Sequence, residues 1–544
     1  MNALLIAAAV AAAGPGPSEV HEHSPQLGKL AFESSCTRPA HALLEQGLAW
    51  LHSFEYAEAE RSFSEAASAD SRCAIAYWGI AKTYYHPLWA APTPAELDKG
   101  RAALAQARGV RAANQREQDY IAALDAFYRD SDKLDHKTRV LAYNVAMADV
   151  HRRYPNDREA AVFYALSLIA AGLLDGDPEF TKEKEAGEIL NVVLKQEPDH
   201  PGAAHYLIHS FDYPPLAHIA LPAAQRYANI APDSAHAQHM PSHIFTRLGL
   251  WEEAIKSDLK AEAAARAYAK SKGMPDSWDE RLHAMDYLAY AYLQTGQDAE
   301  AQRVFSDLKA IKRVDPPNLK VAYTATAIPA RILLERRAWR DAAALELPAN
   351  VRALAPLKDF QWAQAHVHFA RAIGAARSGK ARQAREEVAK LAAIEQAMVV
   401  DAGTYDWKTQ VSIGRQGAEA WIAHAEGKVE DAVRIMRGAA DLDDATEKHP
   451  VTPGAILPAR EQLGELLLAV GKPADALAAY EASLRRAPRR LAGLYGAAKA
   501  AKLVGDTAKV ARYFADLAEV TKSSEGTRPE VKEARSFAAA VASR

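Results

Sequence analysis

Apolar residues recur along most of this 544-residue chain at the spacing of one buried helix face. Turn-forming residues interrupt that pattern often, so the sequence predicts pairs of antiparallel helices rather than long single ones. Two residue types return after 34 positions, alanine at Ala186, Ala220 and Ala254 and proline at Pro198 and Pro232. No stretch shows the apolar–polar alternation of a half-buried strand. The pattern therefore predicts an all-α protein built from repeated helical hairpins.

The clearest unit runs from Leu463 to Pro488, LGELLLAVGKPADALAAYEASLRRAP. Its small residues let two helices approach closely, Tyr480 fills the space between them, and Pro488 ends the second helix. Period and signature resemble those of tetratricopeptide repeats, which are helix–turn–helix units. The resemblance covers most of residues 40–520 and implies an α-solenoid with a right-handed superhelix.

The repeat pattern divides the chain into six segments. They are a signal-like leader over 1–13, an extended lead-in over 14–39, a solenoid with a His/Asp-rich groove over 40–310, degenerate hairpins over 311–450, well-formed repeats over 451–522, and a C-terminal helix or tail over 523–544. Turn-rich inserts such as KSKGMPDSW, KRVDPPN and DDATEKHPVTPG break the period. Inserts of this kind form longer loops, which often carry function on a repeat scaffold.

The first residues are similar to a secretory signal. An apolar stretch from Ala3 to Ala13 is followed by Gly14, with small residues at a cleavage position near Ala13. No lysine or arginine precedes that stretch, so a flexible apolar tail is the alternative. We expect export, to the periplasm of a bacterium. Beyond this leader, no apolar run approaches the roughly 20 residues of a membrane-spanning helix.

The chain has two cysteines, Cys36 and Cys73. A disulfide between them suits an exported protein, and two buried free thiols are the alternative; spacing does not decide between them. Charge is balanced, with 66 Lys and Arg against 69 Asp and Glu. Because no basic stripe appears, we expect no nucleic-acid partner. Nucleophile elbows, phosphate loops and dinucleotide fingerprints are also absent from the sequence.

Histidine and aspartate gather on three consecutive predicted first helices. Aligning Ala220, Ala254 and Ala301 as equivalent second-helix residues places a trio of polar side chains at helical spacing on each preceding helix. The trios are His205, His209 and Asp212; His236, His239 and His243; and His283, Asp286 and Tyr290. The repeat resemblance implies that all three face the concave groove. Stacked helices lie roughly 8–10 Å apart, so side chains of neighbours can share one ion or ligand.

Imidazole with carboxylate is a ligand set for a divalent transition metal. Zinc, copper and iron all accept it, so the metal stays open. The eight histidines and aspartates of the trios are candidate ligands, and Asp212 and Asp286 are alternatively partners that orient a ring. A helix beginning at Pro241 would leave His236 and His239 in the preceding turn, because proline disrupts a helix interior. Without a metal, the trios would line a polar groove for an anionic or peptide ligand.

Further groove candidates lie outside the metal ligands. Arg247 and Tyr290 adjoin the trios, and His52 and His86 come from the first hairpins. Alternatively, Arg247 is a salt-bridged surface residue and Tyr290 packs between helices. For His52 and His86, the alternative is that they are ordinary helix-end histidines.

Two hypotheses about function follow. The first is a binding or scaffold protein whose groove holds a metal, a peptide or protein, or a small polar ligand. The second is a metal-dependent hydrolase or oxidoreductase, in which three ligands leave a position for water or oxygen and Tyr290 or an unliganded histidine moves protons.

Five stretches together resemble a group of exported bacterial tetratricopeptide-repeat proteins. They are SPQLGKLAFESSC, GLAWLHSFEYAEAE, AYWGIAK with the HPLW that follows it, HPGAAHYLIHSFDYPPLA and HMPSHIFTRLGLW. The resemblance covers nearly the whole mature chain. It implies an all-helical superhelix and brings no catalytic mechanism.

Overall fold

The computed structural model describes residues 25–110, 112–400 and 403–542. Its first part contains α1 (Arg38–His52), α2 (Tyr56–Ala69), α3 (Ala74–Thr83), α4 (Pro94–Val110), α5 (Gln115–Tyr128), α6 (His136–Arg153), α7 (Arg158–Asp175) and α8 (Thr181–Gln196). The helices of the central part are α9 (Pro201–Ser210), α10 (Ala217–Ile230), α11 (Ala235–His239), α12 (Pro241–Leu248), α13 (Trp251–Ser271), α14 (Asp279–Gln294), α15 (Asp298–Ala310) and α16 (Leu319–Glu335).

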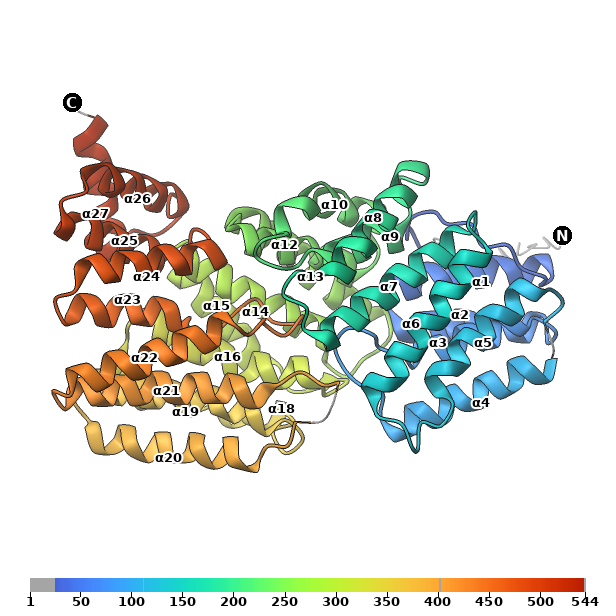
Figure 1. Ribbon diagram of the computed structural model, residues 1–544, viewed down its shortest axis with the longest axis horizontal. Helices are drawn as coiled ribbons and strands as arrows, with labels where there is room; N and C mark the ends of the chain where they lie inside the picture. The colour runs from blue at the N-terminus through green and yellow to red at the C-terminus, as the bar shows by residue number, and fades with distance from the viewer. Residues whose placement is uncertain (1–24, 111, 401–402, 543–544) are drawn as a thin grey trace, which may run out of the picture.

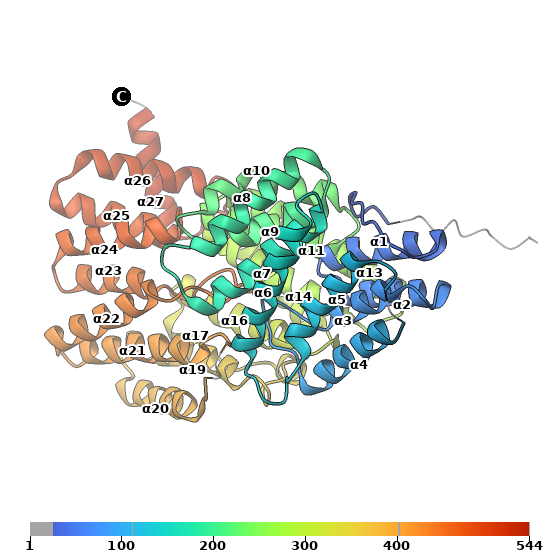
Figure 2. The same ribbon diagram turned by 45° about the vertical axis from the view of Figure 1, so that its right-hand side comes forward.

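The last part begins with the short helices α17 (Trp339–Ala343) and α18 (Ala349–Leu354) and the 3-10 turn η1 (Gln361–Ala363). The hairpins that follow are α19 (Gln364–Arg377), α20 (Ala381–Ala397), α21 (Trp407–Ala425), α22 (Val429–Asp444), α23 (Ala459–Ala469), α24 (Pro473–Arg486), α25 (Leu491–Val504), α26 (Thr507–Val520) and α27 (Pro529–Ala542). The all-α helical-repeat prediction is confirmed. Figures 1 and 2 show the helices stacked as hairpins, with the described termini far apart.

Close helix packing has a simple steric cause. Phe63 on α2 lies against two glycines, Gly47 on α1 and Gly79 on α3, where an added Cβ would come within 2.6 Å of its ring. Tyr480 on α24 fills the same place in the C-terminal unit, between α23 and α25. One aromatic ring therefore joins three successive helices, and only a residue without a side chain leaves room for it.

The lead-in is extended and tied to the repeats. Lys29 donates its backbone N–H to the carbonyl of Asp199 at 3.0 Å, and α1 begins after it at Arg38. Cys36 and Cys73 form a disulfide, which decides between the two alternatives that the sequence left open. The signal-like leader over 1–13 lies outside the described residues.

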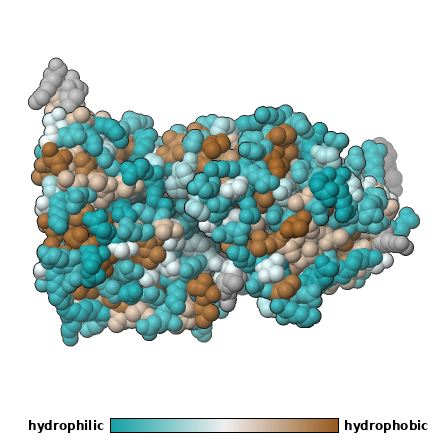
Figure 3. Space-filling view, viewed as in Figure 1, coloured by the Kyte–Doolittle hydropathy of each residue, from teal (hydrophilic) through white to brown (hydrophobic). Residues whose placement is uncertain are grey.

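Two of the turn-rich inserts pair with each other. β1 (Ser277–Trp278) and β2 (Val314–Asp315) form a two-residue parallel bridge, the sheet of the described chain, which the sequence pattern did not predict. Among the described residues, no helix combines the length and the apolar character needed to cross a membrane. Figure 3 shows hydrophobic side chains in separate patches on a mainly hydrophilic face.

A third insert crosses the molecule. Residues 445–458, between α22 and α23, are here named the strap. Lys448 of the strap reaches Asp212, which follows α9, and its Nζ lies 2.9 Å from the carboxylate. Tyr287 on α14 donates a hydrogen bond to the strap carbonyl of Thr452 at 3.0 Å. The strap therefore covers the central helices from a distant part of the sequence.

Candidate metal centre

Four helix segments position the histidines. α9 starts at Pro201 and is capped by the His200 ring, which accepts from the N–H of Ala203. Ser234 caps α11 in the same way. Pro241 is the first residue of α12, where its missing N–H costs nothing. Met240 between α11 and α12 keeps helical angles, φ −53° and ψ −34°, so the chain continues almost straight. A helix does begin at Pro241, a possibility that the sequence left open, but His236 and His239 still lie on the short helix α11 directly before it.

The six histidines converge as two triads. The first triad is His205, His209 and His236, and the second triad is His239, His243 and His283. In each triad the ligand nitrogens lie within 4.8 Å of one another. Each combines two rings one turn apart on one helix stretch with one ring from the next helix. Rings from neighbouring helices thus come together, as expected, and the trio on 236–243 is divided, because His236 turns toward α9 while His239 turns toward α14.

Ring nitrogens of the triads meet at short distances. In the first triad, the Nε2 atom of His205 lies 3.1 Å from that of His209 and 3.2 Å from that of His236. In the second, the Nε2 atoms of His239 and His243 are 3.0 Å apart. Ligand nitrogens on a tetrahedral zinc ion, at roughly 2.0–2.1 Å from it, lie about 3.3 Å from each other. The observed distances between ring nitrogens, 3.0–3.2 Å, are close to this nitrogen–nitrogen distance.

The other nitrogen of three rings has an oxygen partner. Nδ1 of His205 lies 2.6 Å from the carbonyl of His52, that of His239 lies 2.6 Å from Asp258, and that of His243 lies 3.0 Å from Asp212. A carbonyl accepts only, and so does the carboxylate of Asp212, whose pKa is held low, so the proton is assigned to Nδ1 in His205 and His243. In a neutral ring, Nε2 then carries a lone pair. This is the arrangement that orients metal-binding histidines. Burial raises the pKa of Asp258 well above its ordinary value, and a protonated Asp258 donates to His239 instead.

Burial keeps five of the six rings neutral. All six are at most 6% exposed. Desolvation lowers the pKa of His205, His209, His239 and His283 well below the ordinary value, and it lowers that of His243 to about 4 against the opposing pull of Asp212. In the second triad, the Nε2 lone pair of His243 therefore faces Nε2 of His239 at 3.0 Å. A cation between the two rings would take the place of a proton there.

A third cluster of similar composition is already satisfied. His52 and His200 each place Nε2 on Glu159, at 2.8 and 3.0 Å. The remaining nitrogen of His52 lies 3.0 Å from the hydroxyl of Tyr206, and that of His200 accepts from a backbone N–H. Each ring nitrogen thus has a partner, and the two donated protons balance the carboxylate. His52, expected to line a ligand groove, is a structural residue whose carbonyl orients His205.

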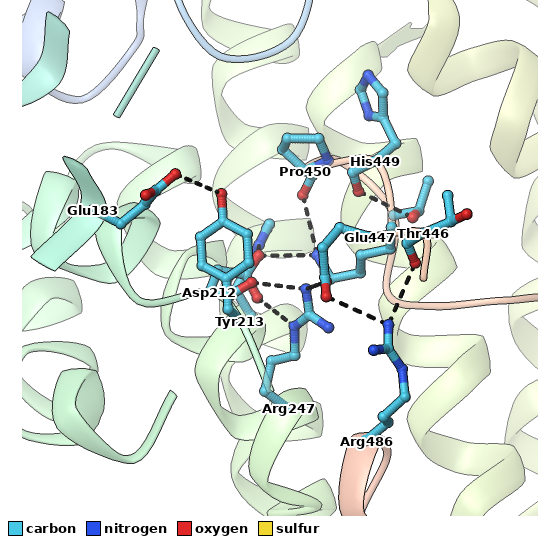
Figure 4. A network of polar contacts seen from close by, with 12 residues as sticks. Glu183, Asp212, Tyr213, Arg247, Thr446, Glu447, His449, Pro450 and Arg486 are labelled. Atoms are coloured by element: carbon cyan, nitrogen blue, oxygen red, sulfur yellow. Dashed lines mark hydrogen bonds and ion pairs between the residues drawn. The ribbon is translucent and has the colours of Figure 1, made fainter. Parts of the chain in front are cut away.

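Asp212 supports the second triad rather than a metal directly. It accepts from His243, from Arg247 Nε at 2.8 Å and from Lys448, and Figure 4 shows it between the α12 arginine and the strap. Two cations and one ring N–H hold the pKa of this buried carboxyl well below its ordinary range. Asp212 therefore takes the second role that the sequence allowed, that of orienting a ring.

Other predicted site residues lie elsewhere. Asp286 accepts from Arg331 at 2.6 Å and is not in either triad, because that buried cation holds it. Tyr290 accepts from Arg490 at 2.7 Å. His86 lies 3.1 Å from the carbonyl of Thr83, at the end of α3 as a helix-end histidine would. None of the three joins the histidine triads.

Sequence reasoning missed Asp258 and Tyr287. Asp258 is fully buried on α13, and its ring partner is His239. A signal was present, since it stands four residues after Ala254 on the apolar face of an amphipathic helix. Tyr287 has its hydroxyl 3.3 Å from Nε2 of His243.

The expected open groove is wrong for these residues. The triads are buried rather than exposed on a concave surface. Phe54 packs on His205 with ring centroids 4.4 Å apart, and Trp89 lies 5.6 Å from His236. The strap also covers this region, where its residues contact Trp89, Tyr287 and Asp212. The cause is long-range packing, which brings residues of the first hairpins and of the C-terminal part over the central helices.

Comparisons with known proteins do not identify a family for this chain. No protein-family model matches the chain, and neither does any curated protein. Among solved structures, a human IFIT1 dimer with m7Gppp-AAAA is 13% identical, covering 82% of this chain and 90% of that one, with a TM-score of 0.37. The Naa15/Naa10 complex bound to HypK-THB is 14% identical, covering 92% and 73%, with a TM-score of 0.24. Likenesses this distant do not bear on function, so the argument for this chain rests on its own residues.

Proposed function

We propose that this helical-repeat protein binds two transition-metal ions, one at each histidine triad. The observation that carries the proposal is the convergence of five Nε2 atoms at 3.0–3.2 Å from a neighbouring ring, together with the Nδ1 atoms of His205, His239 and His243, which contact a carbonyl, Asp258 and Asp212. A neutral ring with its proton on Nδ1 directs its Nε2 lone pair at the centre of the triad, where a cation would bind it.

The donor set narrows the metal. Six imidazoles with neither thiolate nor carboxylate in the triads favour zinc, copper or iron and disfavour the oxygen-preferring magnesium and calcium. The carboxyl groups of Asp212 and Asp258 would not touch the ion. They contact the rings of His243 and His239, and in this way partly offset the charge of the ion. Zinc and copper suit an all-nitrogen, buried site of this kind best.

Two roles are compatible with such sites. In the first, the ions organise a helical-repeat scaffold for binding another molecule. In the second, the protein is a metal-dependent enzyme, a hydrolase or an oxidoreductase. Three histidines per ion favour the second role, because closed structural zinc sites use four protein ligands whereas catalytic sites use three and leave one position open.

Metal content tests the proposal directly. We expect elemental analysis of the purified full chain to find about two ions per molecule. Replacing His205 and His209 by alanine should remove one ion, replacing His239 and His243 should remove the other, and all four changes should remove both, because two ligands of each site are lost. Circular dichroism checks that each variant is folded.

The matched control is His366→Ala. This ring is half-buried, with Nδ1 2.9 Å from Thr326, and it lies outside both triads, so the variant should keep two ions. A native protein that holds no metal and takes up neither zinc, copper nor iron would disprove the proposal. Equal metal content in wild type and the fourfold variant would disprove the assignment to the triads.

Asp258 offers a finer test. Asp258→Ala should weaken metal binding at the second triad by roughly 10- to 100-fold, because His239 loses the partner that fixes its orientation. Asp258→Asn keeps an acceptor oxygen and should cost less. Competition titration with a chromophoric chelator measures both sites, and unchanged affinity at the first triad is the internal control. If the second triad bound metal as tightly in Asp258→Ala as in wild type, the role given to this carboxyl group would be contradicted.

A further inference from the structure

A small cavity adjoins the first triad. Its volume of about 30 Å³ holds one or two water molecules. His209 of the first triad lines it on one side. The other walls include Leu88, Ile169, Leu173, Asp212, Arg247 and Lys448. The cavity therefore joins a candidate ligand to a patch of charged side chains beneath the strap.

The rest of the first triad is tightly packed. The ring of His205 stacks on Tyr227, with centroids 5.1 Å apart, and meets Phe54 edge-on at 4.4 Å. His236 lies against Trp89. These aromatic contacts leave little space for a further molecule, whereas the cavity at His209 provides it.

Charges around the cavity favour an anion. Arg247 and Lys448 are both within hydrogen-bond distance of Asp212, at 2.8 and 2.9 Å, so two buried cations share one buried carboxylate. Glu447 also lines the cavity and contacts Arg247 at 3.4 Å, but its side chain is 33% exposed and solvent screens it. Figure 4 shows Arg247 between Asp212 and Glu447. The buried side chains of the cavity wall thus carry more positive than negative charge even without a metal ion.

We propose that the ion of the first triad keeps one coordination position open toward this cavity and accepts there a small anion of at most three non-hydrogen atoms. The inference rests on the proposed function, because it needs the ion. Water supplies hydroxide as the natural member of this class. The small cavity volume favours a small anion over a peptide or a sugar as the ligand of the ion.

Azide binding to the copper(II)-loaded full chain tests the inference. Metal content is measured first by elemental analysis, and azide is then titrated while its charge-transfer absorption on copper is recorded. We expect a saturable band with wild type and none with benzoate, which is too large for the cavity. Leu173→Phe should fill the cavity and abolish the azide band while copper content stays the same. Lys448→Met should weaken azide binding roughly tenfold, because a nearby buried positive charge is lost.

Matched controls separate the cavity from general disturbance. Leu174→Phe changes the neighbouring, likewise partly buried leucine, which does not line the cavity, and should bind azide as wild type does. Arg486→Met removes a cation from the other side of the strap and should also have no effect. Absence of copper would mean that the proposed function fails. Copper bound at both triads without an azide band, or azide binding by Leu173→Phe equal to that of Leu174→Phe, would overturn the inference alone.

Discussion

Replacing Arg490 by alanine is expected to lower the free energy of unfolding by about 3–5 kcal/mol. This residue precedes α25 and is completely buried. Its guanidinium donates to Glu335 at 2.6 Å and to Glu461 at 3.0 Å. Removing it leaves two carboxylates buried without their cation, and burial already raises the pKa of Glu461. The same guanidinium joins α14, α16, α23 and α25, so the loss should spread over several hairpins.

Urea unfolding followed by circular dichroism measures this effect. Arg490→Lys keeps the charge but not the planar fork, so we expect an intermediate loss. Arg512→Ala is the matched control, because that side chain is 67% exposed and its ion pair with Asp516 is long, at 4.0 Å. It should change stability by less than about 0.5 kcal/mol. An Arg490→Ala protein as stable as Arg512→Ala would show that the buried ion pairs contribute nothing net.

Acidification is expected to destabilise the metal-free protein strongly. The buried triad rings with lowered pKa values stay neutral in the folded state at a pH where the unfolded chain protonates them. Between about pH 6.5 and 4 the unfolded state therefore binds more protons, and the free energy of unfolding falls as pH falls. His243 alone, with its pKa lowered from 6.5 to about 4, accounts for about 3 kcal/mol across that window. Above pH 6.5 this contribution to the pH dependence disappears.

Melting temperatures of the metal-free protein at several values from pH 7.5 to 4.5 measure this dependence. A His239→Gln/His243→Gln variant should show a shallower loss, because two rings no longer titrate. Protein loaded with zinc should resist acid further, because each bound ion competes with protons for Nε2. A melting temperature of the metal-free wild type that stays constant from pH 6.5 to 4.5 would contradict the assignment of these rings as buried and neutral.

Local sequence predicted the helices well, and it identified all six triad histidines. Periodicity of apolar residues and the return of alanine and proline are properties of short segments, set by hydrogen bonds between residues four apart. The hairpin containing Tyr480 was recognisable for the same reason, since the aromatic ring and the glycines that receive it recur at the repeat length. The spacing of His205 and His209, one turn apart, also follows from a single helix.

Local sequence could not predict which histidines belong to the same triad. His236 and His239 stand three residues apart, yet they belong to different triads, because His236 meets His205 on α9 whereas His239 meets His283 on α14. Asp258 carried a signal that can be read, a charge on the buried face of an amphipathic helix. His52 and Asp286 carried a misleading one, since each has a partner, Glu159 or Arg331, that lies far away in the sequence.

By itself, the sequence determined an array of helical hairpins and placed imidazoles one turn apart on its central helices. Only the tertiary structure decided which rings meet, that they are buried, and which carboxylates orient them. The physical reason is the distance along the sequence between the residues that determine each feature. Helix periodicity depends on neighbours within a few residues, whereas burial of the second triad depends on contacts such as that of Lys448 with Asp212, 236 residues apart. Such contacts leave no periodic trace in a single sequence.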